Sequence, residues 1–330
     1  MDLLYSRDGV LMGAVLMGAV RRYSLDMAFG DPDENDFTLT VPVRDDCMEV
    51  GDWVFHPGTE YGGIVDGVDY DDQADDPTVT YRGRTWHGVL SKSILRPDAG
   101  SDYLTVSGDV TSVLSSLIDR QGLGRVFDVV PGESGSVTSY RFARYVDAYT
   151  GILSMLGSVG MRLRVRKGLG KCELSAVPVV DLADVVDDAR MSIRVVAGRP
   201  ECNHLVCLGE GELSARTVVD LYLTDDGRVT EDRAHAGEDD LQETYENTGA
   251  DRAKLVEGGT ERLMKYYEDS MKVEADIPDG SGVTVGDVVT GRSVVVPVTV
   301  VAPVASVSVK SSYDSDPVAS YSVGTSRVIW

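Results

Sequence analysis

The chain has 330 residues, of which 54 are acidic and 31 are basic, so its formal net charge is −23 at pH 7. A surface of this charge repels a phosphate backbone, which argues against specific nucleic-acid binding. Hydrophobic residues make up 42% of the sequence, enough for two or three folded domains. No apolar run reaches the length of about 20 residues that a membrane-spanning helix needs. We therefore expect a soluble, folded protein with no membrane span.

The first hundred residues predict short β-strands. Leu11–Val20 reads Leu-Met-Gly-Ala-Val twice, which is too short for a membrane span, lacks the basic start of a secretory signal and is explained best by a half-buried hairpin. Strand-like runs separated by Gly, Pro and Asp occur at Thr38–Val43, Asp52–His56, Gly63–Val68 and Thr78–Arg82. The acidic cluster Asp69–Asp76 predicts an exposed hairpin tip. Strands this short and closely spaced are typical of a small barrel or sandwich.

Two amphipathic helices are predicted after Pro97. The first has apolar residues at helical spacing from Val110 to Ile118, with Ser107 or Asp109 as its N-cap. The second extends from Tyr149 to Leu156 and ends near Gly157 or Gly160. These helices indicate that the middle of the chain is a compact α+β unit.

Two strands complete this unit, one with alternating arginines and one at Cys172–Val180. Arg162, Arg164 and Arg166 alternate with apolar residues, so all three guanidinium groups lie on one face of the strand. A solvated face or a salt-bridge surface between subunits explains them better than a nucleic-acid groove, because no aromatic residues are interleaved.

The C-terminal part returns to strands. Leu221–Thr230 predicts a hairpin in which Gly227 has a positive φ. The charged stretch from about 239 to 269 predicts a helix with a break at Gly258-Gly259. Val283–Val309 is rich in valine, and its prolines, Pro297 and Pro303, favour edge positions.

A short repeat links the two ends of the chain. Met48–Val54 and Val283–Val289 each contain a Gly-Asp pair followed by an apolar strand. The repeat suggests two related small barrels. The predicted fold is therefore mainly β with α+β: a barrel domain at 1–98, a central α+β domain at 99–192, and a second barrel at 193–330 with a helical insertion near 239–269.

The sequence contains no recognisable catalytic motif. The four histidines stand apart in sequence, and none has the spacing of a helical zinc site. Cys202, His204 and Cys207 do not share one strand face, so buried free thiols explain the cysteines better than a metal. Asp31–Asp36 begins like a calcium loop, but Asp36 replaces the glycine of its sharp turn. We expect no catalytic residue, cofactor or metal.

Several segments form an ordered set along the chain. They are Arg21–Tyr23, Asp36–Pro42, Val50–Val54, Glu60–Val65, Tyr81–Leu90, Ile94–Pro97, Asn203–Val206, Gly209–Glu212 and Gly286–Val289. In this order they resemble the tail-hub (tail-tip, minor tail) proteins of siphophages and prophages, which are similar to the baseplate hub of contractile-tailed phages.

The resemblance implies a structural virion protein at the tail tip, made in the cytoplasm of the bacterial host. It implies a homotrimer in which two barrels per chain build a ring around the DNA channel, adapting the sixfold tail tube to a threefold tip. The implied partners are the distal tail protein, the tape measure protein and tip or fibre proteins, and DNA passes through without specific binding. Asp52, Trp53, Arg84, Trp86 and Asp287 are the candidate structural or interface residues.

Two other functions remain open at this point. A tail-associated cell-wall hydrolase or endopeptidase would need a catalytic dyad or a metal site. A host receptor-binding module would use Trp53, Trp86 and Tyr61 as a platform for carbohydrate, although packing in a barrel core is the commoner fate of such aromatics.

Overall fold

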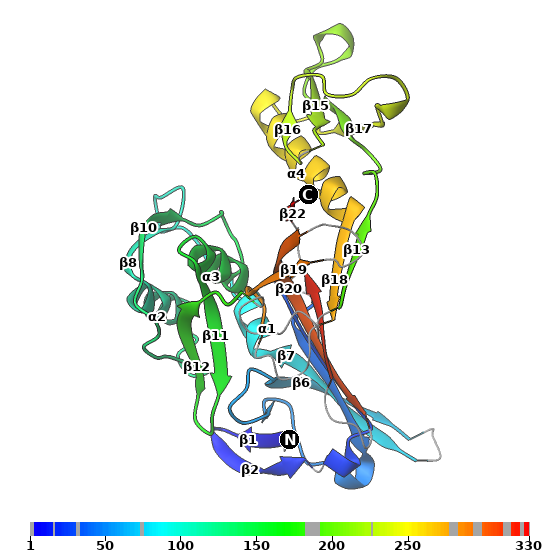
Figure 1. The fold of residues 1–330 in the computed structure, drawn as a ribbon. Coiled ribbons are helices and arrows are strands. Elements are labelled where there is room, and N and C mark those ends of the chain that lie inside the picture. The colour runs from blue at the N-terminus through cyan, green and yellow to red at the C-terminus, as the bar shows by residue number, and fades with distance from the viewer. Residues whose placement is uncertain are drawn as a thin grey trace. The chain divides into compact units, whose positions relative to one another are not determined.

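The computed structural model describes residues 3–15, 17–30, 34–72, 76–181, 192–225, 227–276, 283–292, 299–312, 318–323 and 327–329. The chain forms two compact units (Figure 1). The first combines Met1–Ser192 with Ala275–Val323 and Ile329–Trp330, and the second combines Ile193–Glu274 with Gly324–Val328.

A large antiparallel sheet forms the centre of the first unit. Its strands follow one another in the order β21-β20-β3-β4-β7-β6-β5-β1-β2. Their bounds are β1 Leu3–Arg7, β2 Val10–Val15, β3 Arg22–Ala28, β4 Asp36–Pro42, β5 Trp53–Phe55, β6 Gly62–Asp71, β7 Thr78–Thr85, β20 Thr299–Ser312 and β21 Val318–Val323. The start of β20 also pairs with β19, Val288–Arg292. Because β20 pairs with β3 along seven residues, segments from both ends of the sequence share this sheet.

One face of the large sheet is buried and the other is polar. Tyr23, Leu25 and Met27 of β3 are at most 1% exposed, whereas the intervening Ser24 and Asp26 are half-buried. The same alternation in β4 and β7 creates one continuous apolar face. Each large side chain that is fully buried there contributes about 1.5–3 kcal/mol by leaving water.

A short helix, α1 (Trp86–Ser91), follows β7 directly. The Gly88 N–H donates to the Thr85 hydroxyl at 3.1 Å, which caps its first turn. All six helical residues are buried, so the helix has no polar face and no amphipathic pattern. For this reason the sequence did not predict it.

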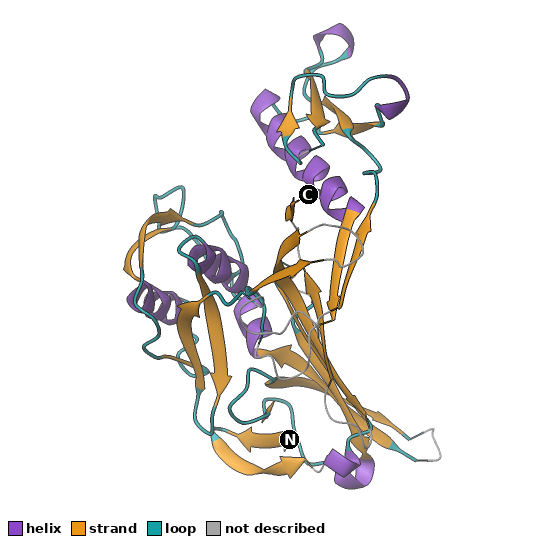
Figure 2. Ribbon diagram, viewed as in Figure 1, coloured by secondary structure: helices purple, strands orange, loops and turns teal. Residues whose placement is uncertain are grey.

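The central part of the first unit is α+β, as predicted (Figure 2). It contains β8 Thr105–Asp109, α2 Val110–Arg120, β9 Phe127–Val129, β10 Ser136–Arg141, α3 Ala148–Gly157, β11 Met161–Lys167 and β12 Cys172–Pro178. Asp109 and Asp147 cap α2 and α3 by accepting backbone N–H groups at 2.9 Å. Both predicted helices and both predicted strands are confirmed. Of the two candidate N-caps of the first helix, Ser107 and Asp109, Asp109 is the cap.

The second unit packs a long helix on a four-stranded sheet. The strand order is β16-β15-β14-β17. The bounds are β14 His204–Leu208, β15 Val218–Leu223, β16 Val229–Thr230, β17 Gln242–Glu246 and α4 Arg252–Ser270. Two further strands, β13 (Ser192–Ala197) and β18 (Met271–Asp276), are neighbours in a sheet. The hairpin between β15 and β16 was predicted, and Gly227 has a φ of +75°.

The prediction of a helix over 239–269 is wrong in two respects. Gln242–Glu246 is a strand, and α4 continues through Gly258 and Gly259 without a break. A Cβ at Gly258 would lie 2.5 Å from the Tyr245 hydroxyl, and one at Gly259 would lie 2.6 Å from the Leu221 side chain. The two glycines therefore let the helix approach the sheet closely, and the packing gained there offsets their low helix propensity.

The mainly β fold with an α+β part is confirmed. The prediction of three domains at 1–98, 99–192 and 193–330 stays a prediction. Pro297 and most of the acidic tip after Asp72 lie outside the described residues. Among the described residues, no helix is both long and apolar enough to cross a membrane.

Candidate structural and interface sites

A Gly-Asp turn before β5 is built around the carboxylate of Asp52. The Asp52 carboxylate accepts the Glu49 N–H at 2.9 Å, and the Asp52 N–H donates to the Glu49 carbonyl at 3.1 Å. The Gly51 N–H donates to the Val65 carbonyl at 2.8 Å, and the Val65 N–H donates to the Asp52 carbonyl at 2.9 Å. This network closes the turn and joins it to β6.

A second Gly-Asp turn, before β19, has the same hydrogen bonds. Asp287 accepts the Thr284 N–H at 3.1 Å, and its own N–H donates to the Thr284 carbonyl at 3.1 Å. This turn bonds to Val304 of β20 as the first turn bonds to Val65 of β6. The Gly286 N–H donates to the Val304 carbonyl at 3.0 Å, and the Val304 N–H donates to the Asp287 carbonyl at 2.7 Å. The sequence repeat is therefore a structural repeat.

Both turns need glycine before the aspartate. Gly51 has a φ of +98° and Gly286 a φ of +95°. Side chains with a Cβ rarely adopt such values. The shared Gly-Asp pair thus reports one backbone conformation that occurs twice.

Each aspartate is paired with an arginine from a distant part of the first unit. Arg7 of β1 donates to both carboxylate oxygens of Asp52 at 2.8 Å, and its side chain is 34% exposed. Arg162 of β11 lies 2.5 Å from the carboxylate of Asp287, and these side chains are 10% and 0% exposed. Asp287 also accepts the Val180 N–H at 2.9 Å. In the first pair the carboxylate is buried and the arginine is partly exposed, whereas in the second pair both side chains are buried.

The two carboxylates have opposite pKa shifts. Partial burial works to raise the pKa of Asp52, but hydrogen bonds from Arg7 and from the Glu49 N–H outweigh it and lower that pKa below its usual value. For Asp287, burial dominates and raises the pKa, although Val180 and Arg162 work against it. Removal from water penalises the charged form, and only at Asp52, whose arginine is partly exposed, do the hydrogen bonds outweigh this penalty.

Trp53 and Trp86 pack against each other in the first unit. Their ring centroids are 5.5 Å apart at an interplanar angle of 73°, and Trp86 is completely buried. Tyr61 is only partly exposed and packs against the same core. The rings therefore do not form the exposed platform that carbohydrate binding by these residues would require.

A buried lysine joins the β11–β12 hairpin to the large sheet. The Lys167 ammonium lies 3.8 Å from the ring centroid of Phe55 and donates to the carbonyls of Gly168 and Gly170 at 2.7 and 2.6 Å. Its backbone pairs with Thr59. Burial lowers the pKa of Lys167 to about 8. Lys167 continues the alternation of Met161, Leu163 and Val165, so the period of two places it on the inward face of β11 although it is a lysine.

Arg84 forms an ion pair across β6 and β7. It donates from Nε and Nη2 to Asp66 at 2.8 and 2.7 Å, and both side chains are more than a third exposed. Exposed pairs of this kind contribute at most about 1 kcal/mol to stability. Arg84 is thus held in place at the surface, and its role in an interface stays a prediction.

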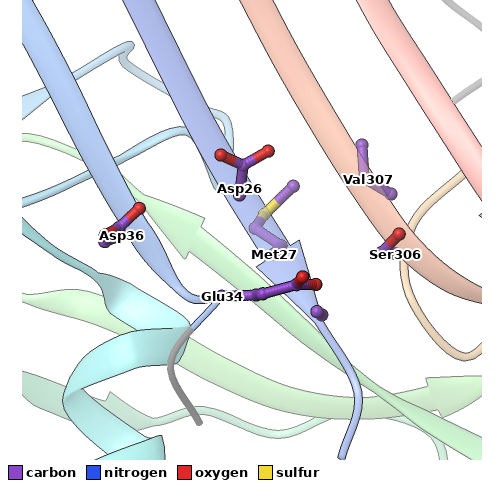
Figure 3. Close-up of a pocket in the computed structure, with 7 residues that line it drawn as sticks. Asp26, Met27, Glu34, Asp36, Ser306 and Val307 are labelled. Atoms are coloured by element: carbon purple, nitrogen blue, oxygen red, sulfur yellow. The ribbon is translucent and has the colours of Figure 1, made fainter. Parts of the chain in front are cut away.

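Carboxylates line a hollow at the large sheet (Figure 3). The hollow has a volume of about 260 Å³ and lies between β3, the start of β4 and β20. Asp26, Glu34 and Asp36 contribute its acidic side chains. Burial and the neighbouring Asp26 raise the pKa of Asp36. Within the described part of the chain, no group of three or more acidic, histidine or cysteine side chains is arranged to hold a metal ion.

Two of the four histidines, His87 and His204, lie against carboxylates. Both ring nitrogens of His204 face carboxylates, Asp240 at 2.8 Å and Asp220 at 3.0 Å, so neither nitrogen is available to a substrate. His87 is 2% exposed and lies 3.4 Å from Glu60. Neither is placed to exchange a proton with a bound molecule.

No protein-family model matches the sequence, and no curated protein matches it either. Solved structures do share its fold. The tail protein from Neisseria meningitidis MC58 does so with a TM-score of 0.52 at 13% identity, covering 98% of this chain and 96% of that chain. The 43 kDa tail protein of prophage MuSo2 from Shewanella oneidensis has a TM-score of 0.51 at 12% identity, with 98% and 96% covered.

These matches define a class: the chain has the fold of phage and prophage tail proteins. The expected resemblance to tail proteins is confirmed at the level of the fold, over nearly the full length of the chain.

Proposed function

We propose that the chain is a structural subunit of a phage tail tip, or baseplate hub, at the distal end of the virion tail. The observation that supports this most strongly is the fold shared with two tail proteins over 98% of the chain. In the proposal the protein has no enzymatic role. Three copies form a ring around the DNA channel and adapt the sixfold tail tube to a threefold tip.

The repeated Gly-Asp turn supports this symmetry. If each turn marks one of two related halves, three chains supply six similar elements to the ring, which matches a sixfold tube. The proposed neighbours are the distal tail protein, the tape measure protein and the tip or fibre proteins. Assembly takes place in the cytoplasm of the bacterial host.

The edge of the large sheet supports self-association. β2 is the last strand of the sheet and pairs only with β1 among the described strands. Its residues Val10, Leu11 and Met12 are 63%, 47% and 49% exposed. An exposed apolar edge strand is a ready surface for pairing with another chain.

The net charge of −23 is consistent with a conduit for DNA. A channel lined by carboxylates would let the phosphate backbone pass without the adhesion that cationic side chains provide through counterion release. A structure of the assembled ring with mostly lysine and arginine on its inner wall would contradict this part of the proposal.

Light scattering on the purified chain tests the ring directly. Three copies of the 35.6 kDa chain have a mass of about 107 kDa. We expect this mass, with threefold particles by electron microscopy, and weaker association in Val10→Lys. Val50→Lys is the matched control, because Val50 is also 63% exposed but lies in a turn. A chain that stays monomeric at all concentrations contradicts self-assembly of the ring.

A further inference from the structure

Charge is distributed unevenly along the chain. Residues 99–181, the central α+β part, contain nine basic and eight acidic side chains, whereas the rest of the chain contains 22 basic and 46 acidic ones. The excess negative charge therefore lies entirely outside the central part.

Two arginines and two tyrosines form an exposed patch on this central part. Arg141 lies over the ring of Tyr103 at 4.5 Å, and Arg144 lies over the ring of Tyr145 at 5.4 Å. Tyr103 and Tyr145 are 43% and 55% exposed, and both arginines are exposed. We call these four residues the Arg-Tyr patch.

The backbone brings the two halves of the patch together. Arg141 ends β10 and pairs with Thr105 of β8. The next residue, Phe142, donates its N–H to the carbonyl of Leu104 at 3.0 Å. The segments that carry Tyr103 and Arg144 therefore leave the same end of one two-stranded ladder.

Among the described residues, the arginines of the patch have no carboxylate partner. Elsewhere on the central part, Arg120 pairs with Asp98 and Lys171 pairs with Asp128. Within the described residues, Arg141 and Arg144 form no ion pair. Guanidinium groups that already stack on aromatic rings are held in place to receive a carboxylate.

Tyr145 has a strained backbone. Its φ is +59°, which is uncommon for a bulky residue. Strain of this kind persists where the surrounding structure requires it, and it concentrates at functional sites. At Tyr145 it holds a large ring at the surface, and tyrosine and arginine are among the residues enriched at the energetic centres of protein interfaces.

We propose that the Arg-Tyr patch docks on a carboxylate-rich surface of a second copy of this chain. The inference rests on the proposed ring and names one of its contacts. The remainder of the chain is strongly acidic and supplies the complementary charge, whereas a net charge of −23 disfavours a nucleic acid as the partner. A basic patch does not pair with itself, so the contact is head to tail, the geometry that closes into rings.

Charge reversal in the full-length chain tests the inference. The patch variant is Arg141→Glu with Arg144→Glu. The control is Arg44→Glu with Arg82→Glu, two exposed arginines outside the patch whose reversal changes the net charge equally. By sedimentation equilibrium at 50 and 500 mM NaCl, we expect the patch variant to associate at least tenfold more weakly at low salt. At 500 mM NaCl the difference in association between the wild type and the patch variant should largely disappear. Circular dichroism checks that both variants are folded.

The outcomes separate the two proposals. If the wild type and the patch variant form the trimer with equal affinity, the inference is overturned and the proposed ring is unaffected. The same holds if the patch and control variants associate equally weakly. A wild type that is monomeric overturns both. Binding of fluorescein-labelled single-stranded DNA that the patch variant loses would identify a nucleic acid instead and overturn the inference. A photo-crosslinker at Tyr103 should connect the patch to an acidic segment of an isotopically labelled second copy.

Discussion

The two Gly-Asp turns have the same backbone hydrogen bonds but different electrostatic surroundings. Asp52 meets an arginine that is one-third exposed, whereas Asp287 meets one that is almost fully buried. The pKa is lowered in the first and raised in the second. The conformation of the turn is therefore set by its backbone hydrogen bonds. We expect its contribution to the free energy of unfolding to depend on how far the paired arginine is buried.

Replacing Asp287 with Ala should have the largest effect. It leaves the Arg162 guanidinium buried without its counter-charge and removes the acceptor of two backbone N–H groups, so we expect a loss of about 3–5 kcal/mol in the free energy of unfolding. Urea unfolding followed by tryptophan fluorescence measures it. Adding Arg162→Met should restore part of the loss, and a double variant less stable than Asp287→Ala alone would contradict this explanation.

Replacing Asp52 with Ala should cost less, about 1–2 kcal/mol. Arg7 is partly solvated, so it reaches water when its partner is removed. The same unfolding measurement applies. If Asp52→Ala costs as much as Asp287→Ala, exposure of the arginine does not decide the difference between the turns.

The pH dependence of the two sites should have opposite signs. The pKa of Asp52 is lowered on folding, so its contribution is present above about pH 4 and lost as the pH falls through the folded pKa. The pKa of Asp287 is raised, so ionisation above about pH 4 favours the unfolded chain and its contribution falls as the pH rises through the folded pKa.

Unfolding of the wild type, Asp52→Asn and Asp287→Asn between pH 3.5 and 7 measures this difference. Relative to Asp52→Asn, the wild type should gain stability with rising pH. Relative to Asp287→Asn, it should lose stability, by at most about 1.4 kcal/mol for each pH unit. Slopes of the same sign would show that the two carboxylates share one environment.

The smallest effect should come from the glycines. Gly51→Ala and Gly286→Ala each impose a positive φ on a residue with a Cβ, which costs about 1 kcal/mol. No atom lies within 4 Å of a Cβ at Gly51, and at Gly286 the nearest is the Arg162 Cβ at 3.4 Å, an ordinary contact. Similar melting temperatures for the two variants are therefore expected. A much larger loss in Gly286→Ala would mean that packing on Arg162 also matters.

Local patterns predicted the helices α2 and α3, most of the strands and the repeat of the Gly-Asp turn. These features depend on periodicity, caps and turn residues that lie close together in sequence. The helix α1 was missed because burial on all sides removes the amphipathic pattern. The partners of the two aspartates could not be predicted from local patterns. Arg7 lies 45 residues from Asp52, and Arg162 lies more than a hundred residues from Asp287.

The glycines in α4 show the opposite failure. Local propensity predicted a break at Gly258-Gly259, but contacts with Tyr245 and Leu221 require small residues at these positions. Among the candidate residues, Trp86 is completely buried, in agreement with core packing as the commoner fate of such aromatics, and its role in an interface stays a prediction. Asp52 and Asp287 were chosen from a repeat that indicated a turn without indicating burial.

The position of β20 in the large sheet has a consequence for synthesis. Ser24 of β3 pairs with Lys310 of β20, so one edge of β3 has no partner until about 290 further residues have been synthesised. At about 5–20 residues per second, that strand edge remains unpaired for roughly 15–60 seconds on the ribosome. During this interval the free edge of β3 is available for pairing with other nascent chains. The sheet closes late and through distant contacts, so its folding should be slow and sensitive to translation speed.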